Sequence, residues 1–405
     1  MNLNDITVPP ASPDALPPTA TVDLGIFGGG QLGRMLAMSA LPLGVRCSFF
    51  DPAGDQCPAA SLGPVFGSAA SLPASSTDPL QKFAQSAPLF TYEFENIDPA
   101  LVRSIAQHKP VMPGLASLEL SRHRWEEKSL FTRLGIPGAA WRPISSLNDL
   151  SQAVRELGLP VVLKTATQGY DGKGQCVLRA PGDLENVWEK MAAQTPLIAE
   201  QWIAFQRELS LIAVRSRTGD TVFYPLVENT HHHGILSHTL APAPRLTAAL
   251  QQQAEDYCQR ILQHTQHTGV LTLELFELDQ QLLANEMAPR VHNSGHWSIE
   301  GAHCSQFENH IRALMGWPLG STDCQRPTAM INLIGRLPDL PALLAIPELH
   351  VHLYGKTPRP GRKLGHLTLQ ADSLDTLQER MQAIGALLPE PLALIPVETK
   401  ETIRG

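Results

Sequence analysis

The hydrophobic pattern of the chain changes once along its length, and this change limits the folds that it can adopt. In the first hundred residues, short apolar runs at 24–27, 45–50 and 89–93 are separated by helix-like segments. Alternating strands and helices predict a parallel, doubly wound α/β sheet. A helix over residues 124–134 is expected to follow and to end at Gly135-Ile136-Pro137.

From Val161 onwards, strand-like runs follow one another without long helices between most of them. The runs lie at 161–164, 175–178, 197–202, 209–215, 221–227, 271–278 and 282–287. Consecutive runs of this kind predict a largely antiparallel sheet in an α+β unit. After Gly320, a Pro-rich stretch leads to a last small unit with runs at 350–354 and 366–369.

Charge and composition exclude several classes of protein. The chain has 405 residues, so several packed units are expected. Its formal net charge of -8 and pI near 6.0 argue against a nucleic-acid binder. No apolar run approaches the roughly 20 residues of a membrane helix. The first basic residue is Arg34, which argues against a targeting peptide. Six scattered cysteines without a C-x-x-C pair predict buried thiols in a reducing cytoplasm.

A glycine-rich turn opens the first predicted helix. Gly28, Gly30 and Gly33 form a G-x-G-x-x-G pattern after a strand, and Asp51 lies near the distance of a ribose-binding acid. The pattern is typical of dinucleotide sites, but the same glycines suit any tight turn between a strand and a helix. An NAD-dependent oxidoreductase is therefore one alternative function.

A second glycine-rich loop joins two strand-like runs at residues 164–175. Gly169, Gly172 and Gly174 allow backbone N–H groups to close over an anion, and Lys164 and Lys173 would neutralise phosphate charge. No Ser or Thr follows Lys173, so the loop is not a Walker loop. It favours phosphate binding, with an exposed hairpin as the alternative.

Two glutamates predict a metal site. Glu274 and Glu286 lie in apolar runs separated by Asp279-Gln280-Gln281, which is expected to form a turn. If the turn is symmetric about Gln280, the two glutamates lie opposite each other on one face of a hairpin, with Cβ atoms about 5 Å apart. Carboxylates so placed repel unless a cation lies between them, and oxygen ligands suit Mg²⁺. One exposed glutamate on an irregular strand is the alternative.

Three further segments offer groups for nucleotide and substrates. Glu200-Gln201-Trp202-Ile203 ends a strand and could present backbone groups to adenine, with Glu208 nearby for ribose, although spacing alone does not establish this. Arg290 offers a planar fork for a small carboxylate-like anion, and His292 could move a proton. A basic segment at 356–363, with a solvated turn as its alternative interpretation, would suit a phosphate; its cations are Lys356, Arg359, Arg362 and Lys363.

Together these segments resemble the N5-carboxyaminoimidazole ribonucleotide synthetases, a family of ATP-grasp carboxylating ligases of purine biosynthesis. The resemblance extends from about residue 22 to the C-terminus and depends on residues 28–35, 91–96, 169–175, 285–297 and 354–366. The Asn-Glu-Met-Ala-Pro-Arg-Val-His-Asn-Ser-Gly-His-Trp segment at 285–297 is the most specific, and the glycine turn is the least.

The resemblance implies a three-domain organisation and a homodimer. The expected parts are a flexible leader at 1–21, a doubly wound preATP-grasp domain at 22–122, an ATP-grasp domain at 123–320 and a small C-terminal domain at 321–405. The glycine turn would then frame part of the substrate cleft instead of binding nicotinamide.

The resemblance also implies the ligands and the residues that bind them. Contacts with ATP are expected from Arg124, Lys164, Gly169, Tyr170, Asp171, Gly172, Lys173, Gly174, Gln175, Glu200, Gln201, Trp202, Ile203, Glu208, His231 and Asn285. Glu274 and Glu286 would hold magnesium, with two ions expected alongside ATP. Catalytic handling of bicarbonate and substrate is expected from Arg290, His292 and Lys356, and substrate contacts also from Tyr170, Asp171, Lys173, Arg359, Arg362 and Lys363.

The chain departs from the family pattern at three positions. His123 stands where the family usually has Asp before the arginine, and Ala166 and Thr167 stand where an arginine pair is frequent. The loss of the arginines predicts altered phosphate contacts and leaves the expected reaction unchanged.

The expected reaction joins bicarbonate to the amine of 5-aminoimidazole ribonucleotide. Transfer of the γ-phosphoryl group of ATP would convert bicarbonate into carboxyphosphate, and attack by the amine would release phosphate. Three alternatives remain: another ATP-grasp ligase that uses formate or biotin, the NAD-dependent oxidoreductase, and a nucleotide-binding module without catalysis.

Overall fold

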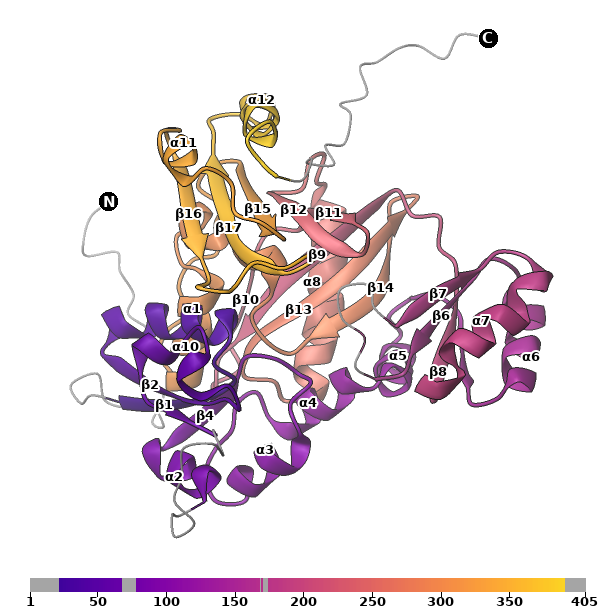
Figure 1. Cartoon of the computed structure of the whole chain (residues 1–405), viewed down its shortest axis with the longest axis horizontal. Helices are drawn as coiled ribbons and strands as arrows, with labels where there is room; N and C mark the ends of the chain where they lie inside the picture. Colours follow the sequence, from indigo (N-terminus) through magenta and orange to yellow (C-terminus); the bar gives the residue numbers. More distant parts are fainter. Residues whose placement is uncertain (1–21, 68–77, 168, 170–173, 390–405) are drawn as a thin grey trace.

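The protein is described here by a computed structural model that covers residues 22–67, 78–167, 169 and 174–389. These residues form three β-sheets with flanking helices (Figure 1). The predicted leader at 1–21 lies outside the described residues. So do five residues of the predicted phosphate loop, Gln168, Tyr170, Asp171, Gly172 and Lys173.

The first unit is a four-stranded parallel sheet, as the alternating pattern predicted. The strands pair in the order β3-β2-β1-β4 and are all parallel. Their bounds are β1 Val22–Phe27, β2 Val45–Phe50, β3 Val65–Phe66 and β4 Leu89–Tyr92, with helices α1 Gln31–Ala40, α2 Pro79–Ser86, α3 Pro99–Ala106 and α4 Leu115–Arg122. Leu32 of α1 and Phe83 of α2 belong to two different cores, so helices cover both faces of the sheet.

A small antiparallel sheet projects at one end of the molecule (Figure 1). Helix α5 Arg124–Arg133 precedes it and matches the predicted helix. The strand order is β5-β8-β6-β7, with β5 Trp141–Ile144, β6 Val161–Thr165, β7 Gln175–Leu178 and β8 Leu197–Gln201. Helices α6 Leu147–Leu157 and α7 Leu184–Met191 contribute Leu150 and Val187 to its core.

The third sheet has nine strands and runs through the rest of the molecule. Its order is β14-β13-β9-β11-β12-β15-β17-β16, with β10 paired to β9. The strands are β9 Arg207–Arg215, β10 Thr221–Phe223, β11 Val227–His232, β12 Ile235–Ala241, β13 Gly269–Leu278, β14 Gln281–Ala288, β15 Thr328–Ile334, β16 Leu349–Leu353 and β17 Lys363–Gln370. The accompanying helices are α8 Ala248–His264, α9 Ser298–Gly301, α10 Gln306–Met315, α11 Leu340–Leu344 and α12 Leu374–Gly385.

The large sheet is antiparallel, as predicted, but the runs at 161–164, 175–178 and 197–202, which were expected in the same sheet, form the separate small sheet. The large sheet also joins the central and C-terminal parts of the chain. β12 pairs with β15 from His238↔Ile331 to Ala241↔Thr328. The strands after residue 320 therefore extend the central sheet, and only their outer face carries a separate core with α12.

One hairpin of the large sheet differs from the prediction. The run expected at 221–227 divides between β10 and β11, and the β11–β12 hairpin was not predicted. β11 carries a buried polar side chain, Asn229, that bonds to polar side chains of both neighbouring strands. Asn229 Nδ2 donates to Ser210 Oγ of β9 at 2.8 Å, and Thr239 Oγ1 of β12 donates to Asn229 Oδ1 at 2.9 Å. A strand stabilised by such a network lacks the alternating pattern that sequence reasoning detects.

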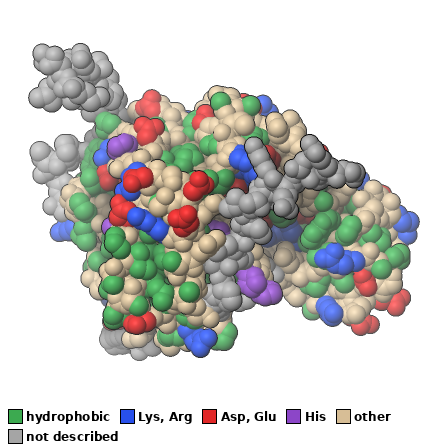
Figure 2. Space-filling view, turned by 90° about the horizontal axis from the view of Figure 1, so that it is seen from above, with side chains coloured by type: hydrophobic (Ala, Val, Ile, Leu, Met, Phe, Trp, Pro, Cys, Tyr) green, Lys and Arg blue, Asp and Glu red, His purple; other side chains and the backbone are tan. Residues whose placement is uncertain are grey.

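No helix in the described part of the chain is long and apolar enough to cross a membrane. All six cysteines are free, and Cys176 and Cys324 are only half-buried, whereas all were expected to be buried. On the face shown in Figure 2, acidic and basic side chains are interspersed among the coloured residues.

Candidate active site

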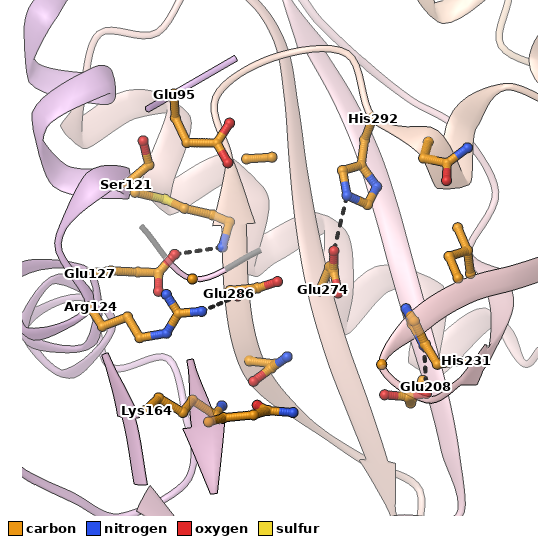
Figure 3. A pocket seen from close by; sticks show the side chains of 18 of the residues that line it. Glu95, Ser121, Arg124, Glu127, Lys164, Glu208, His231, Glu274, Glu286 and His292 are labelled. Carbon is orange, nitrogen blue, oxygen red and sulfur yellow. Dashed lines mark hydrogen bonds and ion pairs between the residues drawn. The ribbon is translucent and has the colours of Figure 1, made fainter. Parts of the chain in front are cut away.

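A pocket of about 680 Å³ opens between the first unit, the small sheet and the large sheet. Many of the predicted site residues line it: Arg124, Lys164, Gly169, Gln175, Glu200, Gln201, Trp202, Ile203, Glu208, His231, Glu274, Asn285, Glu286, Arg290, His292 and Lys363. Figure 3 shows several of these side chains pointing toward one another across the pocket. Gly174, Lys356, Arg359 and Arg362 are not part of this lining.

The glycine turn is filled by the protein's own carboxylates. Glu93 accepts hydrogen bonds from the backbone N–H of Gly30 at 2.5 Å and of Gly33 at 2.6 Å, and Asp51 accepts one from Gly29 at 2.8 Å. Gly28 has φ +98°, and a Cβ there would lie 2.4 Å from Glu93 Cγ. The start of α1 is where a dinucleotide would place its pyrophosphate, so this geometry argues against the NAD alternative.

The predicted pairing of Glu274 with Glu286 is confirmed, but the predicted turn is wrong. The turn has two residues, Asp279 and Gln280, with φ of 50° and 60°, instead of three. Such a turn alone would place Glu274 opposite Asn285. One extra residue between the paired segments forms a bulge at Asn285, and this bulge brings Glu286 opposite Glu274.

The two glutamates have basic partners in the pocket (Figure 3). Glu274 Oε1 lies 3.0 Å from His292 Nε2, and Glu286 Oε2 accepts a hydrogen bond from Arg124 at 3.4 Å. Burial alone would raise the pKa of Glu274, but the hydrogen bond and charge of His292 outweigh it and lower that pKa. His292 Nδ1 in turn lies 2.9 Å from Ser294 Oγ, which orients the ring.

The donor chemistry of this pair fits magnesium shared with a nucleotide. Among the described residues, no three or more His, Cys, Asp or Glu side chains are grouped so as to hold a metal by themselves. Two carboxylates on one pocket wall are the donor set expected for an ion whose other ligands are phosphate oxygens and waters.

A buried ion-pair cluster lies at the small-sheet side of the pocket. Glu200 accepts a hydrogen bond from Lys164 at 2.9 Å and lies 3.6 Å from Lys128 Nζ. Burial opposes ionisation of Glu200, yet the two lysines lower its pKa to about 2. Sequence reasoning did not predict Lys128 or its neighbour Glu127 as site residues, because they lie on a helix that contains no recognised motif. Burial raises the pKa of Glu127 to about 8.

The side chain of Arg290 lies in the pocket and is oriented by Glu95. Its guanidinium forms a bidentate pair with Glu95, in which Nη2 lies 3.0 Å from Oε1, and Nη1 donates to the carbonyl of Val291 at 3.0 Å. Glu95 was recognised within the 91–96 segment but was not predicted as a site residue.

Glu208 and His231 pair within the pocket lining, whereas Lys356 lies outside it. Glu208 Oε2 lies 2.7 Å from His231 Nδ1. Lys356 donates a hydrogen bond to Gln31 at the start of α1, which links the basic segment to the glycine turn. Burial lowers the pKa of Lys356 to about 8, with a further contribution from Arg362.

All three departures from the family pattern can be located, and Thr167 is exposed. His123 is the N-cap of α5, and its Nδ1 accepts a hydrogen bond from the Trp125 N–H at 3.3 Å, as an Asp at this position would. Ala166 is fully buried, and its carbonyl accepts a hydrogen bond from the Arg124 N–H at 2.8 Å.

Comparison with known families agrees with this arrangement. Residues 21–122 match the ribonucleotide synthetase preATP-grasp domain, residues 129–307 the ATP-grasp domain, and residues 328–380 the phosphoribosylaminoimidazole carboxylase C-terminal domain. The fold and the pocket are those of an ATP-grasp enzyme, an ATP-dependent carbon–nitrogen ligase.

Individual relatives identify the family within the ATP-grasp enzymes. An N5-carboxyaminoimidazole ribonucleotide synthase of Pseudomonas aeruginosa is 47% identical over 365 residues, which are 90% of this chain and 99% of that protein. A crystal structure of the synthetase from Thermus thermophilus has 43% identity and a TM-score of 0.85, covering 93% of this chain and 100% of that one. The chain belongs to the N5-carboxyaminoimidazole ribonucleotide synthase family, as its sequence predicted.

A third relative shows what ligands such a fold accepts. The synthase of Aspergillus clavatus, solved in complex with ADP and 5-aminoimidazole ribonucleotide, has 29% identity and a TM-score of 0.82, and the match covers 91% of this chain and 98% of that one.

Proposed function

We propose that the pocket catalyses the ATP-dependent carboxylation of 5-aminoimidazole ribonucleotide by bicarbonate, releasing ADP and phosphate. The observation that carries this proposal is the direct pairing of Glu274 with Glu286 on the pocket wall. Membership of the family and the ligands of the Aspergillus clavatus relative support the same reaction.

ATP would lie between the small and large sheets. Lys164, which pairs with Glu200, and Arg124, which pairs with Glu286, would neutralise the phosphates. Gln201 to Ile203 would border the adenine, and Glu208, held by His231, would meet the ribose. The segment at 170–173, which includes Lys173, remains part of the predicted phosphate loop.

Glu274 and Glu286 would hold magnesium, with two ions proposed alongside ATP. When bound, magnesium would offset charge on the β- and γ-phosphate oxygens. The carboxylates would exchange their contacts with His292 and Arg124 for the ion, which leaves both basic groups available to substrates in the same pocket.

Bicarbonate would bind at the Arg290 end of the pocket. Glu95 holds the guanidinium in one plane, so a small anion meets a pre-oriented donor. His292 would move the proton from the attacking amine, and exclusion of water from the pocket would protect carboxyphosphate. Lys356, with Arg359, Arg362 and Lys363, would bind the ribonucleotide phosphate.

A coupled ATPase assay tests the function. ADP release should require both 5-aminoimidazole ribonucleotide and bicarbonate, and replacing bicarbonate by formate should abolish it. Glu274→Gln and Glu286→Gln should each reduce turnover strongly while the protein stays folded. ADP release without the ribonucleotide requirement, or with formate in place of bicarbonate, would assign another reaction to the pocket.

We also infer a cytoplasmic homodimer, which rests on family resemblance alone. Light scattering of the purified chain would measure the assembly. A monomer at micromolar concentration would overturn the inferred dimer.

A further inference from the structure

The bulge at Asn285 decides which face of β14 carries Glu286. Side chains alternate between the faces of a strand, so a shift of one residue moves every later side chain to the opposite face. Without the extra residue, Glu286 would lie opposite Leu273 and would point away from Glu274. The paired carboxylates therefore depend on the bulge being maintained.

Two adjacent side chains of α5 bind the backbone on both sides of Glu286, at the bulged residue Asn285 and at Met287. Glu127 Oε1 accepts a hydrogen bond from the Met287 N–H at 2.7 Å, and Lys128 Nζ donates to the Asn285 carbonyl at 2.6 Å. Since β14 is the edge strand of the large sheet, side chains of α5 take the place that another strand would occupy.

The burial of this pair is difficult to explain by packing alone. Glu127 is 2% exposed and Lys128 is 3% exposed. Burying an acidic side chain and an ammonium group costs stability that apolar residues of the same size would not cost. Lys128 also lies 3.6 Å from Glu200, so one side chain contacts both the bulge and the predicted ATP wall.

We propose that Glu127 and Lys128 are positioning residues that maintain the Asn285 bulge and thereby hold Glu286 opposite Glu274. Arg124, on the preceding turn of α5, contacts the Glu286 carboxylate at 3.4 Å, so the helix binds both the side chain and the flanking backbone of this residue. The inference rests on the proposed magnesium role of the two glutamates.

Calorimetric titration of Mg²⁺ into the protein saturated with ADP tests the role of Glu127. Glu127→Met removes the acceptor for the Met287 N–H and should weaken magnesium binding by about tenfold or more. Glu127→Gln keeps an oxygen acceptor and should bind close to wild type. Glu126→Met, at the exposed neighbouring position of α5, is the matched control and should match wild type.

Nucleotide binding without metal separates positioning from general damage. ADP affinity in the absence of Mg²⁺ should be unchanged in Glu127→Met, because the proposed defect lies in the carboxylate pair. Lys128→Met should also weaken magnesium binding, and it tests the contact at the Asn285 carbonyl independently.

Hydrogen exchange gives a measurement that does not depend on catalysis, and its result for the wild type does not depend on any variant folding. The Met287 amide should exchange slowly in the wild type and faster in Glu127→Met and Lys128→Met. A rapidly exchanging Met287 amide in the wild type would overturn the proposal, as would folded Met variants with wild-type magnesium affinity. Failure of the carboxylation assay with intact magnesium binding would instead overturn the proposed function alone.

Discussion

The carboxylate of Glu93 accepts a hydrogen bond from the backbone N–H of Gly33 at 2.6 Å, at the start of α1. The same carboxylate accepts a second bond from Gly30, so an internal anion occupies the position where nucleotide-binding folds place a phosphate. The glycine turn of this chain therefore binds an internal carboxylate, and the proposed nucleotide site lies between the small and large sheets.

Glu93→Gln should destabilise the first unit. A glutamine has one oxygen for two N–H donors, so one buried donor would lose its acceptor, at a cost of about 1–3 kcal/mol in the free energy of unfolding. Urea unfolding measures this change, and Asp55→Asn, at an exposed position in the same unit, is the control. Equal stability of Glu93→Gln and wild type would contradict the assigned role of Glu93.

The glycine turn shows which features of the structure can be predicted from the sequence and which cannot. The pattern at Gly28 to Gly33 predicted a strand, a turn and a helix, all of which the structure contains. It did not indicate what the turn binds, because Glu93 lies about sixty residues further along the chain and only the parallel pairing of β1 with β4 brings it there.

The pairing of Glu274 with Glu286 was predicted correctly, but from a turn that differs from the one in the structure. Apolar runs on both sides of a short turn indicated a hairpin, and an assumed three-residue turn gave the correct partner. The real turn is shorter by one residue, and the bulge at Asn285 compensates for it. A bulge leaves no mark in hydrophobic periodicity, and neither do Glu127 and Lys128, whose contacts with β14 join segments about 160 residues apart.

Lys164→Met should weaken ATP binding without unfolding the protein. The variant loses a cation beside the proposed phosphates, while Lys128 still neutralises the buried Glu200. The KM for ATP should rise by about tenfold, which corresponds to one lost charged contact. Steady-state kinetics would measure this rise, with the exposed Lys190→Met as the control, and an unchanged KM for ATP would exclude Lys164 from the nucleotide site.

Arg290→Lys should impair bicarbonate use more than ATP use. Lysine has a single ammonium group and cannot reproduce the bidentate contact with Glu95, so the anion would meet a poorly oriented donor. The KM for bicarbonate should rise by about tenfold or more, with little change in the KM for ATP. Arg312→Lys, on α10 outside the pocket lining, is the control. A parallel rise of both KM values would indicate a general defect of the pocket.

Two buried histidines should make the fold sensitive to mild acid. His310 Nδ1 accepts a hydrogen bond from the Val270 N–H at 3.0 Å, and His267 Nε2 lies 3.0 Å from the Val270 carbonyl. Burial lowers the pKa of His267 to about 4 and that of His310 to about 3. Their neutral forms therefore join β13 to α10 and to the loop after α8.

Because these folded-state pKa values lie below the unfolded value of about 6.5, the unfolded chain binds more protons. Their contribution to stability is complete above pH 6.5 and is lost as the pH falls toward 4. Between pH 7 and pH 5.5, the free energy of unfolding should decrease by roughly 1 kcal/mol per histidine. Urea unfolding at both pH values should show a smaller decrease in His310→Gln and an unchanged one in His108→Gln, whose histidine is exposed. The same decrease in all three proteins would show that other groups cause the acid sensitivity.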